Sequence, residues 1–164
     1  MNPHKSSKQT RTAGVLLGIG LGGFVDGIAL HQIAQWHNML SAKAPPMTMD
    51  TMMLNMRADG WFHAAVFMLT LVGVLMLYRA ARQGALFPPV RWFIGLLLIG
   101  WGAFNLVEGV IDHHLLELHH VRDVPAHVPA YDYAFLLIGG FGFLALGWLL
   151  TRGQAEPELP NDDP

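Results

Sequence analysis

Residues 26–37 read DGIALHQIAQWH, and residues 108–119 read EGVIDHHLLELH. Both stretches follow one pattern: an acid, a glycine, three residues, a histidine, five residues and a second histidine. The pattern returns after 82 residues, which is typical of an internal duplication. The matched pairs are Asp26 with Glu108, His31 with His113, and His37 with His119.

The composition indicates a membrane protein. Of the 164 residues, 52% are hydrophobic and only 13% are charged, which is too apolar for an average soluble domain. Four apolar segments are each about long enough to cross a hydrocarbon core of ~30 Å as a helix: 13–36, 61–78, 92–111 and 134–150. The predicted fold class is therefore all-α, a polytopic integral membrane four-helix bundle of two tandem two-helix repeats, surrounded by the lipid bilayer.

Positive charge is divided unequally between the connections. Seven of the ten Lys and Arg residues precede the first segment, join the second to the third, or follow the fourth. By the positive-inside rule, both termini are cytoplasmic, and the loops 38–60 and 115–132 face outward. We expect a cytoplasmic tail over 1–12, a four-helix membrane domain over 13–152, and a disordered tail rich in proline and acids over 153–164.

Ionisable residues gather on the outer side of the expected bundle. Eight of the nine histidines fall there, and Asp26 and Glu108 lie at matched depth, roughly 6–10 Å short of the outer boundary of the core. Ionisable groups inside a membrane are costly unless they are paired or bind a metal, so the sequence predicts a site at the outer, periplasmic face. Its candidate metal ligands are Asp26, His31, His37, Asp59, His63, Glu108, His113, His119 and His120.

Helical periodicity predicts which faces carry this site. At 100° per residue, the stripe through Asp26 reaches His37, and the stripe through Glu108 reaches His119. His114 points the other way. The Asp26 stripe continues inward through three small residues that favour close helix contact, so it is expected to face protein: Gly14, Gly18 and Gly22.

The spacing also limits the site. Asp26 and His31 are five residues apart, about 140° and 7.5 Å on an ideal helix, so a straight helix cannot bring both to one ion. Either the helices form π-type bulges near their Asp-Gly and Glu-Gly steps, or they end early, or the site holds two ions. Asp59 and His63, one turn apart, could ligate a single ion together.

Metal binding is not the sole explanation for these groups. They could instead form a buried hydrogen-bonded network that joins helices, or a proton or ion path; the duplicated acid-His-His set favours metal. There is no cysteine, and imidazole with carboxylate suits copper, zinc or iron. Five methionines in the first outer loop are soft donors that select Cu(I), unless they only fill space: Met47, Met49, Met52, Met53 and Met56.

Three stretches carry a family resemblance: DGIALHQIAQWHNM (26–39), DGWFHAA (59–65) and FNLVEGVIDHHLLELHHVRD (104–123). Over 14–150 the chain resembles the domain of unknown function 2243 family of bacterial four-helix membrane proteins. The resemblance implies a multi-pass inner-membrane protein whose candidate ligands, with His114, match the family pattern, whereas Asn38 and Asp112 depart from the His and Asn expected there. Members are often encoded beside a cytochrome oxidase assembly factor, which implies copper handling and oxidase assembly factors as partners.

Two functions remain open. One is a metal-binding accessory protein at the periplasmic face that aids copper handling or cytochrome oxidase assembly. The other is a membrane metalloenzyme, of hydrolase or oxygenase type, with a mono- or dinuclear centre and Asp26 or Glu108 as ligand or base. A permease is disfavoured because four helices enclose little path without a homo-oligomer, which the sequence leaves open. No basic patch indicates nucleic acid as a partner.

Overall fold

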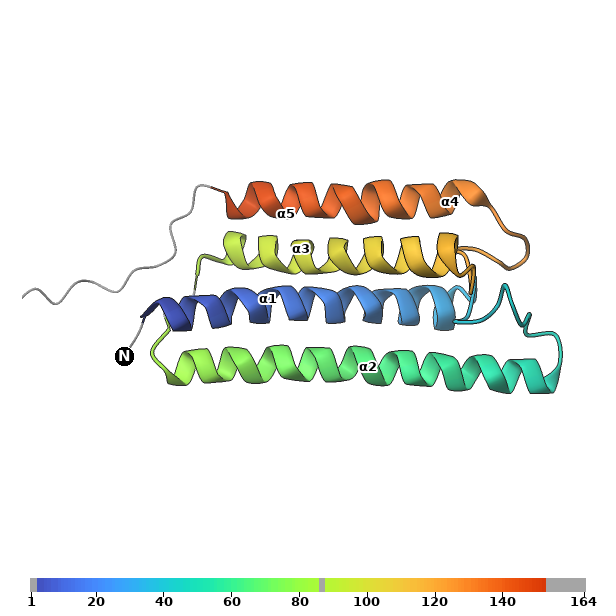
Figure 1. The fold of residues 1–164 in the computed structure, drawn as a ribbon, viewed down its shortest axis with the longest axis horizontal. Helices are drawn as coiled ribbons and strands as arrows, with labels where there is room; N and C mark the ends of the chain where they lie inside the picture. The colour runs from blue at the N-terminus through green and yellow to red at the C-terminus, as the bar shows by residue number, and fades with distance from the viewer. Residues whose placement is uncertain (1–2, 86–87, 153–164) are drawn as a thin grey trace, which may run out of the picture.

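The computed structural model describes residues 3–85 and 88–152, and the regular secondary structure within them is all helical, with no strand. The chain forms four rods, and rods that follow one another in the sequence run in opposite directions (Figure 1). α1 (Pro3–Val25) continues into the π-helix η1 (Asp26–Ile33), α2 (Met49–Arg82) returns, and α3 (Val90–Glu108) continues into η2 (Gly109–Leu115). The fourth rod joins α4 (Pro129–Ala134), η3 (Phe135–Gly142) and α5 (Phe143–Thr151). The expected disordered tail over 153–164 lies outside the described residues.

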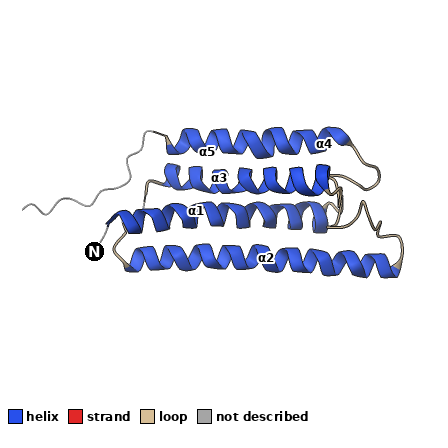
Figure 2. Ribbon diagram, viewed as in Figure 1, coloured by secondary structure: helices blue, strands red, loops and turns tan. Residues whose placement is uncertain are grey.

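All four rods are long and apolar enough to cross a membrane, which confirms the all-α membrane fold class. Figure 2 shows the rods joined by loops, and the two long ones, 34–48 and 116–128, lie at the same end of the bundle. The contacts order them as a row in which α1 packs on α2 and α3, and α3 packs on α5. α1 and α3, which run in the same direction, therefore occupy the middle, and the flanking rods bury little of their surface within the protein.

Glycines set the close contact between the two central helices. A Cβ atom on Gly18 would overlap with the backbone of Leu97, and one on Gly100 would overlap with the backbone of Val15. Only a residue without a side chain fits at both positions, as in close helix contacts of membrane proteins. The expected small-residue stripe is confirmed, because all three of its glycines face α3: Gly14, Gly18 and Gly22.

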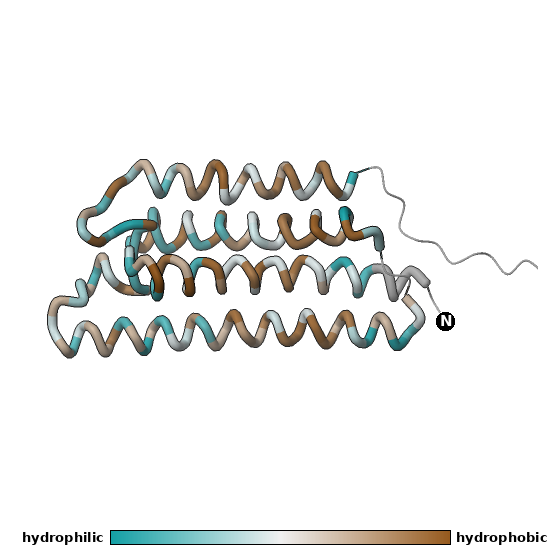
Figure 3. Tube along the Cα trace, turned by 180° about the vertical axis from the view of Figure 1, so that it is seen from behind, coloured by the Kyte–Doolittle hydropathy of each residue, from teal (hydrophilic) through white to brown (hydrophobic). Residues whose placement is uncertain are grey.

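The helices extend beyond the apolar segments that the sequence defines. α2 begins at Met49, 12 residues before the expected start. A capping box closes its first turn: the Thr48 side chain accepts from the Thr51 amide, and the Thr51 side chain accepts from the Thr48 amide. The fourth rod begins at Pro129 rather than at residue 134. Hydropathy marks only the part of a helix that suits lipid, and Figure 3 shows hydrophilic residues gathered at the ends of the apolar rods.

Large apolar side chains cover the outside of the bundle. Phe67, Val72 and Leu75 on α2, and Leu137 and Ile138 on η3, are all exposed. Burying such surface in lipid is favourable and leaving it in water is not. The protein therefore contacts the lipid bilayer along these rods.

Candidate metal centre

Two π-helical turns bring acids and histidines together. η1 begins at Asp26 and η2 follows directly on Glu108. A π-helix bonds residue i to residue i+5, so residues five apart lie one above the other, as they cannot on an α-helix. Asp26 Oδ2 is 3.1 Å from His31 Nε2, and Glu108 Oε1 is 3.9 Å from His113 Nε2. Of the alternatives that the spacing leaves open, the structure has the π-type bulge, and the helices also end before His37 and His119.

His37 and His119 reach the same place from loops. The helices end at Ile33 and Leu115, so the stripes expected to carry a regular helix to these histidines are wrong. Each loop passes through one residue with positive φ, Gln35 at 52° and Glu117 at 47°. This left-handed backbone, usual just after a helix, turns the chain back over the helix end.

The four imidazoles form one buried cluster. The ring centroids of His37 and His119 are stacked 4.6 Å apart, His31 lies 4.4 Å from His37, and His113 lies 4.9 Å from His119. These four residues and both acids are buried. Two overlapping groups have ligand atoms within 4.8 Å of one another: His31 with His37 and His119, and Glu108 with His113 and His119.

Three of the four rings are held from outside the cluster. Nδ1 of His31 contacts Asp59 Oδ1 at 3.1 Å, Nδ1 of His37 contacts the Val121 carbonyl at 2.9 Å, and Nδ1 of His119 contacts the Met39 carbonyl at 3.2 Å. Carbonyl and carboxylate oxygens accept, so these Nδ1 atoms donate and the Nε2 atoms face inward. Metal-binding histidines in proteins are oriented in this way.

The inward-facing atoms lack hydrogen-bond partners. Nε2 of His31, His37 and His113, both oxygens of Asp26, and one oxygen of Glu108 are buried with no such partner. Burial also lowers the pKa of His119 well below its usual range, with the nearby His37 as a further cause, so His119 stays neutral and keeps its lone pair. Its Nε2 lies 3.3 Å from Glu108 Oε1, a contact that needs a proton or a cation between the two atoms.

The two halves of the chain exchange their supports. His37 is held by Val121 and His119 by Met39, and these partners are themselves 82 residues apart. The loop backbones do the same, because the Ala42 amide donates to the Leu118 carbonyl at 3.0 Å and the Val124 amide donates to the Trp36 carbonyl at 2.9 Å. Neither half orients its own loop histidine.

Asp59 and His63 lie outside the groups of ligand atoms in the described residues. Asp59 is buried, and besides His31 it accepts from Asn38 Nδ2 at 2.7 Å and from the Met39 amide at 2.9 Å. The ring of His63 contacts the Asp59 carbonyl at 2.8 Å. Neither belongs to the metal-compatible groups of the described residues, so Asp59 is placed to orient His31.

His120 lies in a further group with two residues that the sequence did not single out as ligands, His127 and Asp132. Asp132 lies in the first turn of the fourth rod, as Asp59 lies before the apolar part of the second, and this shared placement is the signal that could have found it. His114 is exposed and its ring meets Tyr133, outside every group, in keeping with its expected outward direction.

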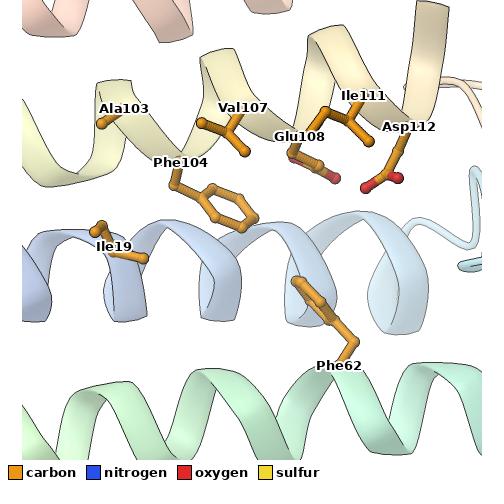
Figure 4. Close-up of a pocket in the computed structure, with 8 residues that line it drawn as sticks. All are labelled: Ile19, Phe62, Ala103, Phe104, Val107, Glu108, Ile111 and Asp112. Atoms are coloured by element: carbon orange, nitrogen blue, oxygen red, sulfur yellow. The ribbon is translucent and has the colours of Figure 1, made fainter. Parts of the chain in front are cut away.

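An apolar pocket of about 290 Å³ reaches the centre from one side. Figure 4 shows the carboxylates of Glu108 and Asp112 beside the space between the central helices, with Phe62 and Phe104 near them. The other lining residues are aliphatic: Ile19, Ala103, Val107 and Ile111. One edge of the buried cluster is therefore accessible to a small apolar molecule.

The comparisons with known proteins agree with this description. No curated protein and no solved structure matches the chain. Residues 13–154 match a family described as predicted membrane protein, domain of unknown function 2243. That match covers the four rods and both acid-His-His stretches, and the chain belongs to this family of membrane proteins.

Proposed function

We propose that the protein binds a transition metal in the buried cluster. The buried ligand atoms carry the proposal: imidazole Nε2 atoms face carboxylate oxygens at 3.1–3.9 Å, and several of these atoms have no hydrogen-bond partner. A nitrogen and a carboxylate oxygen at such distances attract only with a proton or a metal cation between them, and a buried polar atom without a partner is unfavourable. The ligands in this proposal are Asp26, His31, His37, Glu108, His113 and His119.

The donor set suits several ions. Imidazole and carboxylate bind copper, zinc and iron alike, and the two groups share His119, so the centre has room for one ion held by both halves or for two adjacent ions. The alternative of a structural network leaves the unpartnered Nε2 atoms of His37 and His113 without a role.

We place this centre at the periplasmic face of an inner membrane, on the strength of the uneven Lys and Arg distribution. An accessory role in copper handling or oxidase assembly rests on the family resemblance. The five loop methionines support copper to the extent that all are exposed on the outer end of α2 and its approach. This role needs no catalytic residue.

A metalloenzyme is the second candidate, and the apolar pocket favours it. Catalytic metal sites keep a position open for substrate or water, and this pocket ends at Glu108. We expect the visible spectrum of the Co(II)-loaded protein to change with an alkyl hydroxamate, a small apolar chain with a metal-binding head group. Phe104→Trp, which fills the pocket, should abolish that change and leave the metal content intact.

Elemental analysis tests the proposal. The full chain, purified in detergent, is exposed to Cu(II), Zn(II) or Fe(II) and washed. Asp26→Asn and Glu108→Gln keep the side-chain shape but remove the charge, and each should lower the bound metal at least tenfold. Asp112→Asn is the matched control, an acid on the same pocket outside the metal-compatible groups of the described residues. Equal metal in all three variants would refute the proposal.

A further inference from the structure

A second cluster of ligand atoms lies beside the buried centre, toward solvent. His127 Nε2 is 2.8 Å from Asp132 Oδ2, and His120 Nδ1 is 3.5 Å from the same oxygen. The two rings are stacked, with centroids 3.8 Å apart and planes inclined by 13°. Two imidazoles and one carboxylate that converge on one position form a three-ligand set typical of open metal sites, in which water completes the coordination.

The cluster is built rather than incidental. Asp132 is buried, and its other oxygen accepts from the Val121 amide at 2.8 Å, which fixes the carboxylate. The backbone amide of His120 is held at 3.3 Å by Asp123. His120 Nδ1 is buried without a hydrogen-bond partner, although it lies nearest to the shared carboxylate oxygen. These supports fix two of the three ligands before any ion arrives.

Asp132 also touches the buried centre. Its Oδ1 atom is 3.4 Å from Nδ1 of His113, one of the histidines of that centre. Exposure falls steadily along this line, from 41% for the side chain of His127 to 17% for His120, 5% for Asp132 and 1% for His113. The order leads from solvent to the centre through one carboxylate.

Among the described residues of the first half there is no such cluster. Asn38 stands at the position that matches His120, and its amide closes on Asp59 at 2.7 Å. The amide nitrogen of Asn38 donates to the carboxylate and, unlike an imidazole nitrogen, cannot ligate a metal. Entry is therefore expected from the second half alone.

The geometry points to a second, solvent-accessible metal site formed by His120, His127 and Asp132, through which a divalent transition metal ion enters the buried centre. The site itself stands on its own residues, and the entry role rests on the proposed function. Metal passes by exchange of ligands, with no change of oxidation state. The partner is the hydrated ion alone, since the site faces solvent.

Two variants test the site. His127→Gln keeps an exposed polar side chain and removes one ligand, and the double variant His120→Ala with His127→Gln removes two. His114→Ala is the matched control, an exposed histidine outside the groups. The full chain is stripped of metal with a chelator and titrated with Zn(II) and Co(II) in detergent. We expect the double variant to bind one equivalent less than the wild type and the control to bind the same amount.

The rate of filling tests the entry role. With limiting Co(II), the buried centre of His127→Gln should fill at least tenfold more slowly than that of the wild type or of His114→Ala, and reach the same final spectrum. Unchanged stoichiometry in the double variant would overturn the second site, and an unchanged rate would overturn the entry role. His37→Ala separates the two proposals: it should lose the buried equivalent and keep the outer one, whereas full retention of metal would count against the buried centre only.

Discussion

Asp59→Asn should weaken metal binding without removing a ligand. In the structure Asp59 reaches the centre only through His31, whose Nδ1 it holds at 3.1 Å. Removing a carboxylate that orients a metal-binding histidine typically costs 10–100-fold in affinity, or about 1.4–2.8 kcal/mol. The amide oxygen of Asn can still accept from Nδ1 and from the Met39 amide, and the half-buried Asn38 can turn its own oxygen toward the new amide.

Competition titration with a chromophoric chelator measures the loss of affinity, and elemental analysis measures the stoichiometry. We expect a 10–100-fold weaker dissociation constant with an unchanged number of ions, and His63→Ala as a neutral control. A loss of stoichiometry as large as that of Asp26→Asn would make Asp59 a ligand. An unchanged affinity would refute the argument that the outer carboxylate acts on the metal through His31.

The remaining predictions concern symmetry, orientation, the methionines and packing. His31→Ala and His113→Ala should lower metal content by similar factors, and His114→Ala much less, as elemental analysis would show; a one-sided loss would contradict a shared centre. Reporter fusions in the loop over 38–48 should read as periplasmic and fusions after Arg152 as cytoplasmic, and the reverse would place the centre on the inner side. Gly18→Leu, whose side chain would overlap with the backbone of Leu97, should lower the free energy of unfolding in detergent by about 1–3 kcal/mol or more. Gly60→Ala, at a position with open space around it, should leave the free energy of unfolding unchanged. Changing all five loop methionines to Leu (Met47, Met49, Met52, Met53 and Met56) should lower Cu(I) affinity and leave Zn(II) binding intact. Unchanged Cu(I) affinity in a chelator competition would refute the proposal that these methionines bind copper.

Much of the fold follows from local patterns in the sequence. Hydropathy finds the four spans because each buries a long apolar surface in lipid, and the four-residue spacing of small residues locates the contact between α1 and α3. The depth of Asp26 and Glu108 identifies two of the acids that the structure surrounds with imidazoles. These inferences need only the rise and pitch of a helix.

The loops are where sequence reasoning fails. Gln35 and Glu117 adopt positive φ, a conformation that costs on the order of 1 kcal/mol for such residues. Glycine usually marks such a conformation in a sequence, and neither position is a glycine. A regular helix was therefore expected to continue to His37 and His119, although both lie beyond the helix ends. Asp132 escaped notice because its role depends on a long-range contact with His113.

The exchange of supports between halves explains why the acid-His-His pattern occurs twice. A single two-helix half would contain the histidine of its own loop but not the carbonyl that orients it, since Val121 serves His37 and Met39 serves His119. A unit of this kind completes its centre only against a second unit with the same loop. A chain that contains two matched halves always supplies the second unit, and the other residues of the two loops can then differ. The second half has His120 where the first has Asn38, and the path to solvent opens on that side.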